Sequence, residues 1–432
     1  MTMNRRSFIT LVGAATGAGL LGFPYISRAA DIMPKTGRRV VVVGGGSGGA
    51  IVAKQVRLAD PSIEVVLIEA EKSFIACPLS NLVLVGMRTL DENTITLAGL
   101  QANHNIKLVY DTVTAVDPAA KKVICSAGAI AYDKLVLSPG VDFRFEEIEG
   151  YDAATTPEAM PHAWKAGPQT LLLKKRLQDM KDGGVVVLTI PQAPFRCPPG
   201  PYERISMIAH YLKQNKPKSK IIVWDGNETI VAKAPLFKKG WAKHYGYDEK
   251  DSSKGLISYN GNSRLTKVDV KAMAVDNGIE ALKGDVINVI PAQRAGLIAQ
   301  LAGVVGPDKK WCPVDQISFE STQVKDIYVV GDSCSAGALP KSAYSANSEA
   351  KVCALNIVQA LNGKELIAPS HVNVCYSYIT DKEAVTVSGI YVEKDGKTIA
   401  VPNSGGLSPD LNEAEGNYAR SWMQNMLIEM ST

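Results

Sequence analysis

Apolar and polar positions along the chain predict strands that alternate with helices. The five residues Arg39 to Val43 (RVVVV) have the character of a buried strand, and an apolar helical run follows. A turn at Asp60 and Pro61 then precedes a second strand that ends at Glu69. Continuous apolar strands joined by a helix are typical of a parallel sheet covered on both faces. We therefore predict a strand–helix–strand unit over residues 38–69.

Three glycines stand where the first strand turns into the helix. They are Gly44, Gly46 and Gly49, and Glu69 lies 20 residues past the third. In a dinucleotide site the first glycine permits a tight turn and the second lets the backbone approach a pyrophosphate. The third lets the helix pack closely on the strand, and the acid accepts from a ribose hydroxyl. A purely structural glycine turn is the alternative, but the strand–turn–helix setting favours dinucleotide binding.

A second strand–helix–strand unit follows a polar linker at about residues 146–168. Its parts are a strand at 184–190, a helix at 202–213 and a strand at 219–224. Between the first strand and the helix, the segment 194–201 (PFRCPPGP) contains four prolines. Proline fixes φ and removes the N–H groups that would bind a pyrophosphate. This unit is expected to keep the doubly wound shape without binding NADH.

The remaining segments predict a small antiparallel layer and a mixed C-terminal part. Residues 104–135 contain four short strands, which we expect to form that layer. A later apolar strand ends at Gly331 and Asp332, and a helix is predicted over about 343–361. From residue 368 the chain alternates two longer strands with a final helix.

The first thirty residues have a separate character. Arg5 and Arg6 precede an uncharged run over residues 10–26, and the segment ends in small residues at Ala29 and Ala30. This pattern is typical of a twin-arginine signal, which exports folded proteins to the periplasm. An uncleaved membrane anchor is the alternative. No later stretch has the apolar length needed to span a bilayer.

Composition limits the class of protein and of partner. Apolar residues make up 46% and charged residues 21% of the 432-residue chain, which argues against disorder. Residues 1–30 hold three arginines and no acid, so their removal lowers the formal charge from +4 to +1. No basic surface for nucleic acid is expected.

The cysteines and histidines indicate redox chemistry better than metal binding. The chain has seven cysteines, an odd number, none of them in a C-x-x-C-H haem-attachment motif. There are no paired C-x-x-C elements, and the five histidines lack ligand spacing. We expect no metal site and no haem on this chain.

Four segments together resemble the flavoprotein subunit family of flavocytochrome c sulfide dehydrogenase. They are IEAEKSFIACPLSN, FRCPPGPYER, VVGDS and NVCYS. That family is related to sulfide:quinone oxidoreductase within the glutathione-reductase-like FAD proteins, and the match covers essentially the whole mature chain. The resemblance implies an α/β fold with two Rossmann-like doubly wound domains of glutathione-reductase type and a C-terminal α+β interface domain.

The same resemblance implies how the chain is divided after the signal. The FAD-binding domain would comprise residues 36–165 and 291–362. The second Rossmann-like domain, which lacks an NAD fingerprint, would occupy 166–290 between them. The interface domain would be 363–432.

The resemblance also assigns roles to individual residues. Cys77 would be bonded covalently to the 8α-methyl of FAD, although a buried free thiol is the commoner fate of a cysteine. Cys197 and Cys375 would form a redox-active disulfide beside the flavin. A structural disulfide, or a pair between Cys197 and Cys334, remains open. Glu203 is either a proton acceptor for sulfide or a carboxylate favoured by its helix N-terminus.

Further flavin contacts and a possible cover for the ring complete the candidate site. Gly331 and Asp332 resemble the second FAD motif of the superfamily, and Val113 is a further candidate contact. Trp422 could cover a ring near the site, or it could serve packing alone.

The expected activity follows from this resemblance. Sulfide would be oxidised to polysulfide or elemental sulfur, and electrons would pass through FAD to a c-type cytochrome subunit that carries the haem of the heterodimer. A quinone-reducing relative is the nearest alternative and would need an apolar C-terminal segment, whereas residues 418–432 are only mildly apolar. A non-catalytic flavin carrier and an NADH-dependent disulfide reductase are more distant alternatives.

Overall fold

The first sheet is parallel and holds the predicted glycine turn. The computed structural model describes residues 31–251 and 253–432, so the predicted export signal lies outside the described residues. The sheet order is β20-β9-β1-β2-β5, and Val42 of β1 lies opposite Leu67 and Val136. Its strands are β1 (Arg39–Val43), β2 (Glu64–Glu69), β5 (Lys107–Tyr110), β9 (Lys134–Leu137) and β20 (Ile327–Val329).

Two helices pack together on this sheet. They are α2 (Gly49–Ala59), which follows the glycine turn, and α10 (Ala343–Leu361). All five side chains of β1 are buried, which is why four of its five residues are valines. The only charged one, Arg39, is ion-paired with Glu64. The first Rossmann-like unit is therefore assembled from chain segments on both sides of the second unit.

The prediction for residues 104–135 was partly wrong. Only β6 (Val113–Asp117), β7 (Lys122–Cys125) and β8 (Ala129–Ala131) form the antiparallel layer. β5 and β9 join the parallel sheet instead, beside β2 and β1. A short apolar strand pairs equally well in either direction, so its neighbours in space, which the local sequence does not specify, decide its sheet.

The second unit has its own parallel sheet, ordered β13-β12-β11-β17. Its apolar core includes two fully buried aromatic residues, Tyr202 and Trp241. The strands are β11 (Val185–Ile190), β12 (Lys220–Asp225), β13 (Ile257–Asn260) and β17 (Val286–Val289), and the helices are α6 (Pro168–Asp179), α7 (Gly200–Asn215) and α8 (Ala234–Tyr245). The strand order reverses between β11 and β17, which is where a doubly wound sheet opens a ligand crevice.

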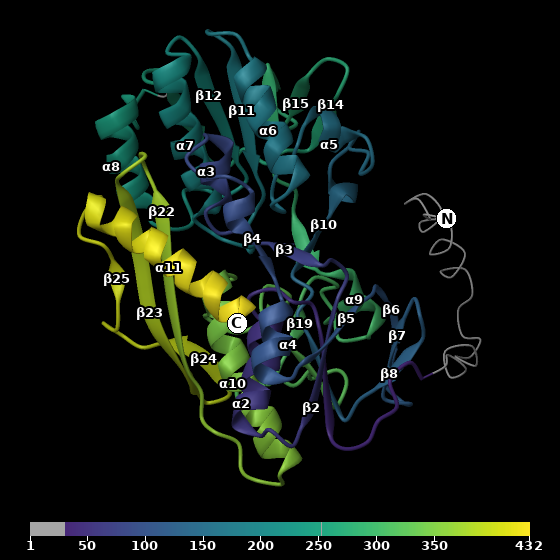
Figure 1. Cartoon of the computed structure of the whole chain (residues 1–432). Coiled ribbons are helices and arrows are strands. Elements are labelled where there is room, and N and C mark those ends of the chain that lie inside the picture. Colours follow the sequence, from purple (N-terminus) through teal and green to yellow (C-terminus); the bar gives the residue numbers. More distant parts are fainter. Residues whose placement is uncertain (1–30, 252) are drawn as a thin grey trace.

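The C-terminal sheet runs along both units. In Figure 1 its strands and α11 lie beside the two stacked sheets, and β22 contacts both α10 and α7. Asn412 caps α11 by accepting from the Glu415 N–H at 2.9 Å. The elements are β22 (Ser370–Tyr378), β23 (Ala384–Lys394), β24 (Lys397–Ala400), β25 (Gly406–Leu407) and α11 (Glu413–Ser431).

Short elements connect these layers, and within residues 31–251 and 253–432 no helix is long and apolar enough to cross a membrane. The short elements are β3 (Ser73–Ile75), α3 (Ser80–Leu84), β4 (Thr94–Thr96), α4 (Ala98–His104), β10 (Val141–Phe143), α5 (Thr156–Ala159), β14 (Lys267–Asp269), β15 (Ala274–Asp276), β16 (Ala281–Lys283), β18 (Gln293–Ala295), α9 (Leu297–Leu301), β19 (Cys312–Pro313) and β21 (Cys334–Ser335), with 3-10 turns η2 (Asp91–Asn93) and η3 (Phe145–Glu147).

Candidate active site

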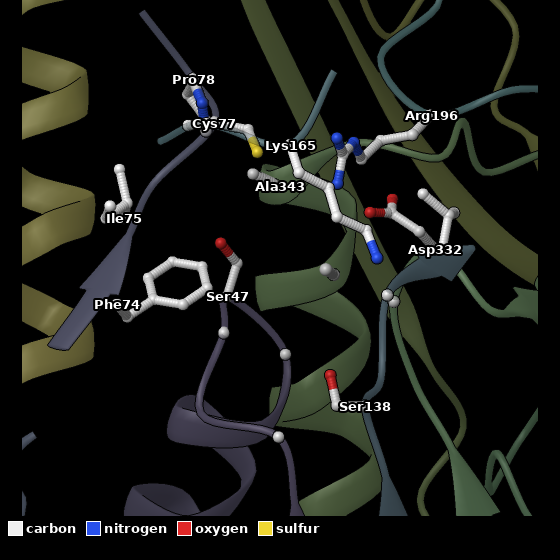
Figure 2. A pocket seen from close by; sticks show the side chains of 18 of the residues that line it. Ser47, Phe74, Ile75, Cys77, Pro78, Ser138, Lys165, Arg196, Asp332 and Ala343 are labelled. Atoms are coloured by element: carbon white, nitrogen blue, oxygen red, sulfur yellow. The ribbon is translucent and has the colours of Figure 1, made fainter. Parts of the chain in front are cut away.

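A cavity of about 730 Å³ lies where the two Rossmann-like units and the C-terminal sheet meet. Figure 2 shows that Cys77, Arg196 and Asp332 reach this space from three separate segments. Its size falls within the range that cofactor sites occupy, about 300–1,000 Å³. All eleven residues predicted as catalytic or cofactor-binding fall near it, and all but Gly49 line its wall directly.

The glycine turn forms one end of the cavity. Gly44 has φ of 97°, and a Cβ added to Gly49 would lie 1.9 Å from the Gly44 carbonyl oxygen. Neither position therefore accepts a side chain without moving the backbone. Glu69 accepts from the N–H of Gly45 at 2.6 Å and of Ala70 at 2.8 Å, which fixes its carboxylate at the cavity wall.

Another part of the wall carries a buried carboxylate with an unused oxygen. Gly331 and Asp332 follow β20, and Oδ1 of Asp332 has no hydrogen-bond partner in the described part of the chain. Burial raises the pKa of Asp332 against the opposing charges of Arg196 and Lys341. A ligand hydroxyl would satisfy this oxygen. The glycine turn, Glu69 and Asp332 thus fit FAD, which needs contacts at its phosphates, ribose and ribityl chain.

Cys77, Val113 and Trp422 also line the cavity. Cys77 is half-buried, and its sulfur lies 3.9 Å from the carbonyl oxygen of Trp164. The Trp422 ring stacks on Tyr344, with ring centroids 6.3 Å apart, and its indole N–H has no partner among the described residues. Trp422 therefore faces the cavity as well as packing on the C-terminal sheet.

The proline-rich turn of the second unit places Cys197 in the same cavity. The Cys197 N–H donates to the carbonyl oxygen of Lys341 at 2.7 Å, and its φ of 57° is unusual for a residue with a side chain. A Cβ on Gly200 would lie 2.8 Å from the Cys197 sulfur. Glycine at position 200 therefore makes room for this sulfur at the start of α7.

Cys197 and Cys375 face each other as free thiols within hydrogen-bonding range. The hydrogen bond from Cys197 and the charge of Lys233 lower the pKa of Cys375 to about 7, although burial acts against them. The hydrogen bond with Cys375, together with burial, raises the pKa of Cys197. The two opposite shifts favour a thiolate on Cys375 over one on Cys197.

Lys233 supplies the cation beside this pair. It is 4% exposed, and its Nζ lies 2.6 Å from the Cys375 carbonyl oxygen, 3.0 Å from Ser377 Oγ and 3.3 Å from the Val385 carbonyl oxygen. These three acceptors are neutral, and burial lowers the pKa of Lys233 while Cys375 and Glu203 oppose this effect. A buried ammonium group needs a counter-charge, and the Cys375 thiolate provides one.

Glu203 also lines the cavity, near the thiol pair. Its carboxylate accepts from Asn81 Nδ2 at 2.7 Å and from the Tyr378 N–H at 2.9 Å. Burial raises its pKa despite these bonds. Arg204, whose pKa burial lowers to about 9, donates to Asn81 Oδ1 at 3.0 Å and so fixes the amide that holds Glu203.

The remaining cysteines lie away from the pair. Cys334, the alternative partner for Cys197, lies 3.4 Å from Glu349 Oε2 and pairs in register with Cys312 on the neighbouring strand. Cys125 and Cys353 are buried in the core of the first unit. The geometry therefore favours Cys375 as the partner of Cys197. No cluster of metal-ligating side chains occurs in residues 31–251 and 253–432.

Sequence reasoning missed three residues of this site. Asn81 and Arg204 lie inside the segments that carry the family resemblance, so a search for polar residues there would have found them. Lys233 gives no such signal, because it lies at the start of α8, outside the segments that carry the family resemblance. Only the folded chain brings it to β22.

Comparison with known proteins defines the class first. The solved structure of the sulfide:quinone oxidoreductase of Aquifex aeolicus superimposes on 91% of this chain and 92% of its own chain, with a TM-score of 0.76 and 19% identity. Residues 38–170 match the family described as pyridine nucleotide-disulphide oxidoreductase. The fold is thus that of the glutathione-reductase-type flavin-dependent oxidoreductases, as predicted.

The particular family follows from more specific matches. Residues 170–291 match "Sulfide dehydrogenase [flavocytochrome c] flavoprotein chain, central", and residues 367–430 match "Flavocytochrome c sulphide dehydrogenase, flavin-binding". A sulfide dehydrogenase flavoprotein chain of Chlorobaculum thiosulfatiphilum is 59% identical over 46 residues, which are 11% of this chain and 96% of that sequence. The sulfide-quinone reductase of Aquifex aeolicus is 27% identical over 312 residues, 68% of each chain. The chain belongs to the flavocytochrome c sulfide dehydrogenase flavoprotein family, which confirms the predicted resemblance.

Proposed function

We propose that this protein oxidises sulfide with a disulfide between Cys197 and Cys375 and passes the electrons through FAD to a c-type cytochrome. The observation that carries the proposal is the thiol pair in the wall of the cavity that fits FAD. In NADH-dependent relatives of this fold a nicotinamide would bring two electrons to that position. Here two sulfur atoms occupy it.

The reaction begins with sulfur exchange at the disulfide. Hydrosulfide attacks the sulfur of Cys197, a new S–S bond forms, and the bond between Cys197 and Cys375 breaks. Cys197 then carries a persulfide and Cys375 a thiolate. A second hydrosulfide takes the outer sulfur as a hydrodisulfide anion, which can grow into polysulfide, and leaves Cys197 as a thiol.

Lys233 and Glu203 act on opposite partners in this exchange. The ammonium group of Lys233 stabilises the Cys375 thiolate as it leaves, because opposite charges attract strongly in a buried site. Glu203, whose pKa is raised by burial, accepts the proton of an incoming hydrogen sulfide molecule. When bound, FAD would supply the acceptor for two electrons from the reduced sulfur pair, whose loss would restore the disulfide, and it would pass these electrons on singly.

Cys77 is proposed to hold FAD covalently through the 8α-methyl group. It lines the same cavity as the glycine turn and has no cysteine partner. The test is to denature and digest the purified protein. Flavin fluorescence should remain on the peptide that contains Cys77 and should be absent from the Cys77→Ala variant. Flavin released entirely into solution would overturn the linkage.

The electron acceptor is proposed to be a c-type haem on a separate subunit in the periplasm. The family descriptions name a flavocytochrome c, this chain has no haem-attachment motif, and its first thirty residues resemble an export signal. Sulfide added to the isolated complex should reduce haem bands in the visible spectrum. Turnover with quinone alone would favour the quinone-reducing alternative, and bound FAD without any turnover would favour a simple flavin carrier.

A further inference from the structure

A second, smaller cavity lies at the switch point of the second sheet. It measures about 210 Å³ and is lined by Thr189 and Ile190 at the end of β11 and by Ile290 just after β17. The strand order reverses between these two strands. In open α/β sheets, ligands bind outside the carboxyl ends of the strands at this reversal. The cavity therefore lies where this fold ordinarily binds a ligand. It is separate from the cavity that contains the sulfur pair.

Two buried polar groups of the cavity wall lack partners. Gln293 is 4% exposed, and its Oε1 accepts from the Arg196 N–H at 2.9 Å. Because an N–H needs an acceptor, this bond fixes the amide so that Nε2 is the free donor. Gln293 Nε2 and the hydroxyl of Thr189, which is 1% exposed, have no partner among the described residues. Buried polar groups of this kind are normally satisfied.

The charge around the cavity is positive. Arg144 and Arg264 line it, and both pair with the single carboxylate Glu147. Each guanidinium group has five N–H donors, so both keep donors beyond these pairs. Lys310 lies at the rim as a further cation. Three cations against one acid favour an anion over a neutral ligand.

We propose that this cavity binds a small inorganic oxyanion of the size of sulfate, phosphate or thiosulfate. The donors are an amide, a hydroxyl and two arginines, which are the groups that recognise anionic oxygens. Its volume is below the range of about 300–1,000 Å³ that larger organic ligands occupy. A dinucleotide is therefore too large for it.

The site also connects to the catalytic turn. Gln293 holds the backbone of Arg196, which directly precedes Cys197. An oxyanion on Gln293 Nε2 would restrict the amide and strengthen its hold on this turn. Oxyanion binding is thus coupled to the mobility of the segment that carries the redox cysteine.

Calorimetric titration of the flavin-loaded protein with sodium sulfate, phosphate and thiosulfate tests the proposal at constant ionic strength. Saturable binding of at least one of them is expected. Gln293→Glu keeps an acceptor for the Arg196 N–H but turns a carboxylate oxygen toward the anion, so affinity should fall by about tenfold or more. Thr189→Val should weaken binding by about threefold through loss of one donor.

Matched controls separate this site from general charge effects. Lys283→Gln removes an exposed cation elsewhere in the same unit and should leave the affinity unchanged, whereas Arg264→Gln should lower it several-fold. Thermal unfolding of each variant checks that it is folded. Sulfate should also slow amide hydrogen exchange in residues 192–197 of the unaltered protein.

Three results would overturn the proposal. They are no saturable oxyanion binding, equal affinity in folded Gln293→Glu protein, and tighter binding of NADH than of sulfate. None of these measurements requires sulfide oxidation, so they stand apart from the proposed activity.

Discussion

The two Rossmann-like units have the same arrangement of strands around their first strand, but the chemistry at their crevices differs. In the first, β1 is flanked by β2 and β9, and in the second, β11 is flanked by β12 and β17. The first turn has glycines whose missing side chains let strand and helix approach closely. The second has prolines, and the N–H groups of Arg196 and Cys197 already donate to Gln293 and Lys341. The residues of one turn therefore decide whether a crevice binds dinucleotide phosphates or positions sulfur.

The largest expected effect comes from removing the sulfur pair. Cys197→Ser and Cys375→Ser should each lower sulfide oxidation by about a thousandfold or more, because the covalent exchange has no other nucleophile or leaving group. Steady-state rates and the flavin spectrum measure this. Cys353→Ala, at a buried cysteine outside the cavity, is the matched control and should retain near-normal activity. Equal rates in all three variants would show that the pair is not used.

Breaking the first turn should remove the cofactor instead. In Gly49→Ala the new Cβ would collide with the Gly44 carbonyl oxygen, so strand and helix must separate, and flavin content should fall by about tenfold or more. Absorbance of the purified protein at flavin wavelengths reports the content. Gly37→Ala adds a Cβ with nothing within 4 Å and should bind flavin normally. Full flavin content in Gly49→Ala would contradict the assignment of this turn.

Neutralising Lys233 should have an intermediate effect. Cys375 has its pKa lowered from 9.0 to about 7, so its thiolate forms as the pH rises through about 7 and is lost below it. Lys233→Met removes the stabilising cation. The pH midpoint for alkylation of the reduced protein should therefore move upward, toward 9.0, and the rate of sulfide oxidation at neutral pH should fall by about tenfold.

Lys239→Met is a suitable control, since that lysine is exposed on the same helix and paired with Asp410. An unchanged alkylation midpoint in Lys233→Met would mean that the ammonium group does not act on Cys375.

The smallest expected effect is on NADH. With its N–H groups occupied and prolines at 198, 199 and 201, the second turn should not bind a pyrophosphate, so excess NADH should leave the flavin oxidised. Anaerobic absorbance spectroscopy measures this, and sulfide in the same cuvette is the positive control. Rapid bleaching by NADH would remove the distinction between the two crevices.

The sequence predicts what depends on neighbours along the chain. The strand Arg39–Val43 and the helix Ala343–Leu361 have the predicted bounds, because uninterrupted apolar runs and their flanking turns are local signals. The glycine turn and the proline-rich turn could also be predicted from the local sequence. Residues that act across the chain could not be predicted in this way. Lys233 reaches Cys375 only because the fold brings the start of α8 to β22, and β5 and β9 join a parallel sheet that their own sequences do not specify.

Mapping the state of Cys197 and Cys375 by mass spectrometry tests the central claim most directly. The protein is alkylated and digested before and after one equivalent of sulfide is added without oxygen. We expect a disulfide-linked peptide pair before sulfide is added, and afterwards a persulfide on Cys197 with alkylated Cys375. Two freely alkylated thiols before sulfide, or a linked pair that sulfide leaves intact, would contradict it.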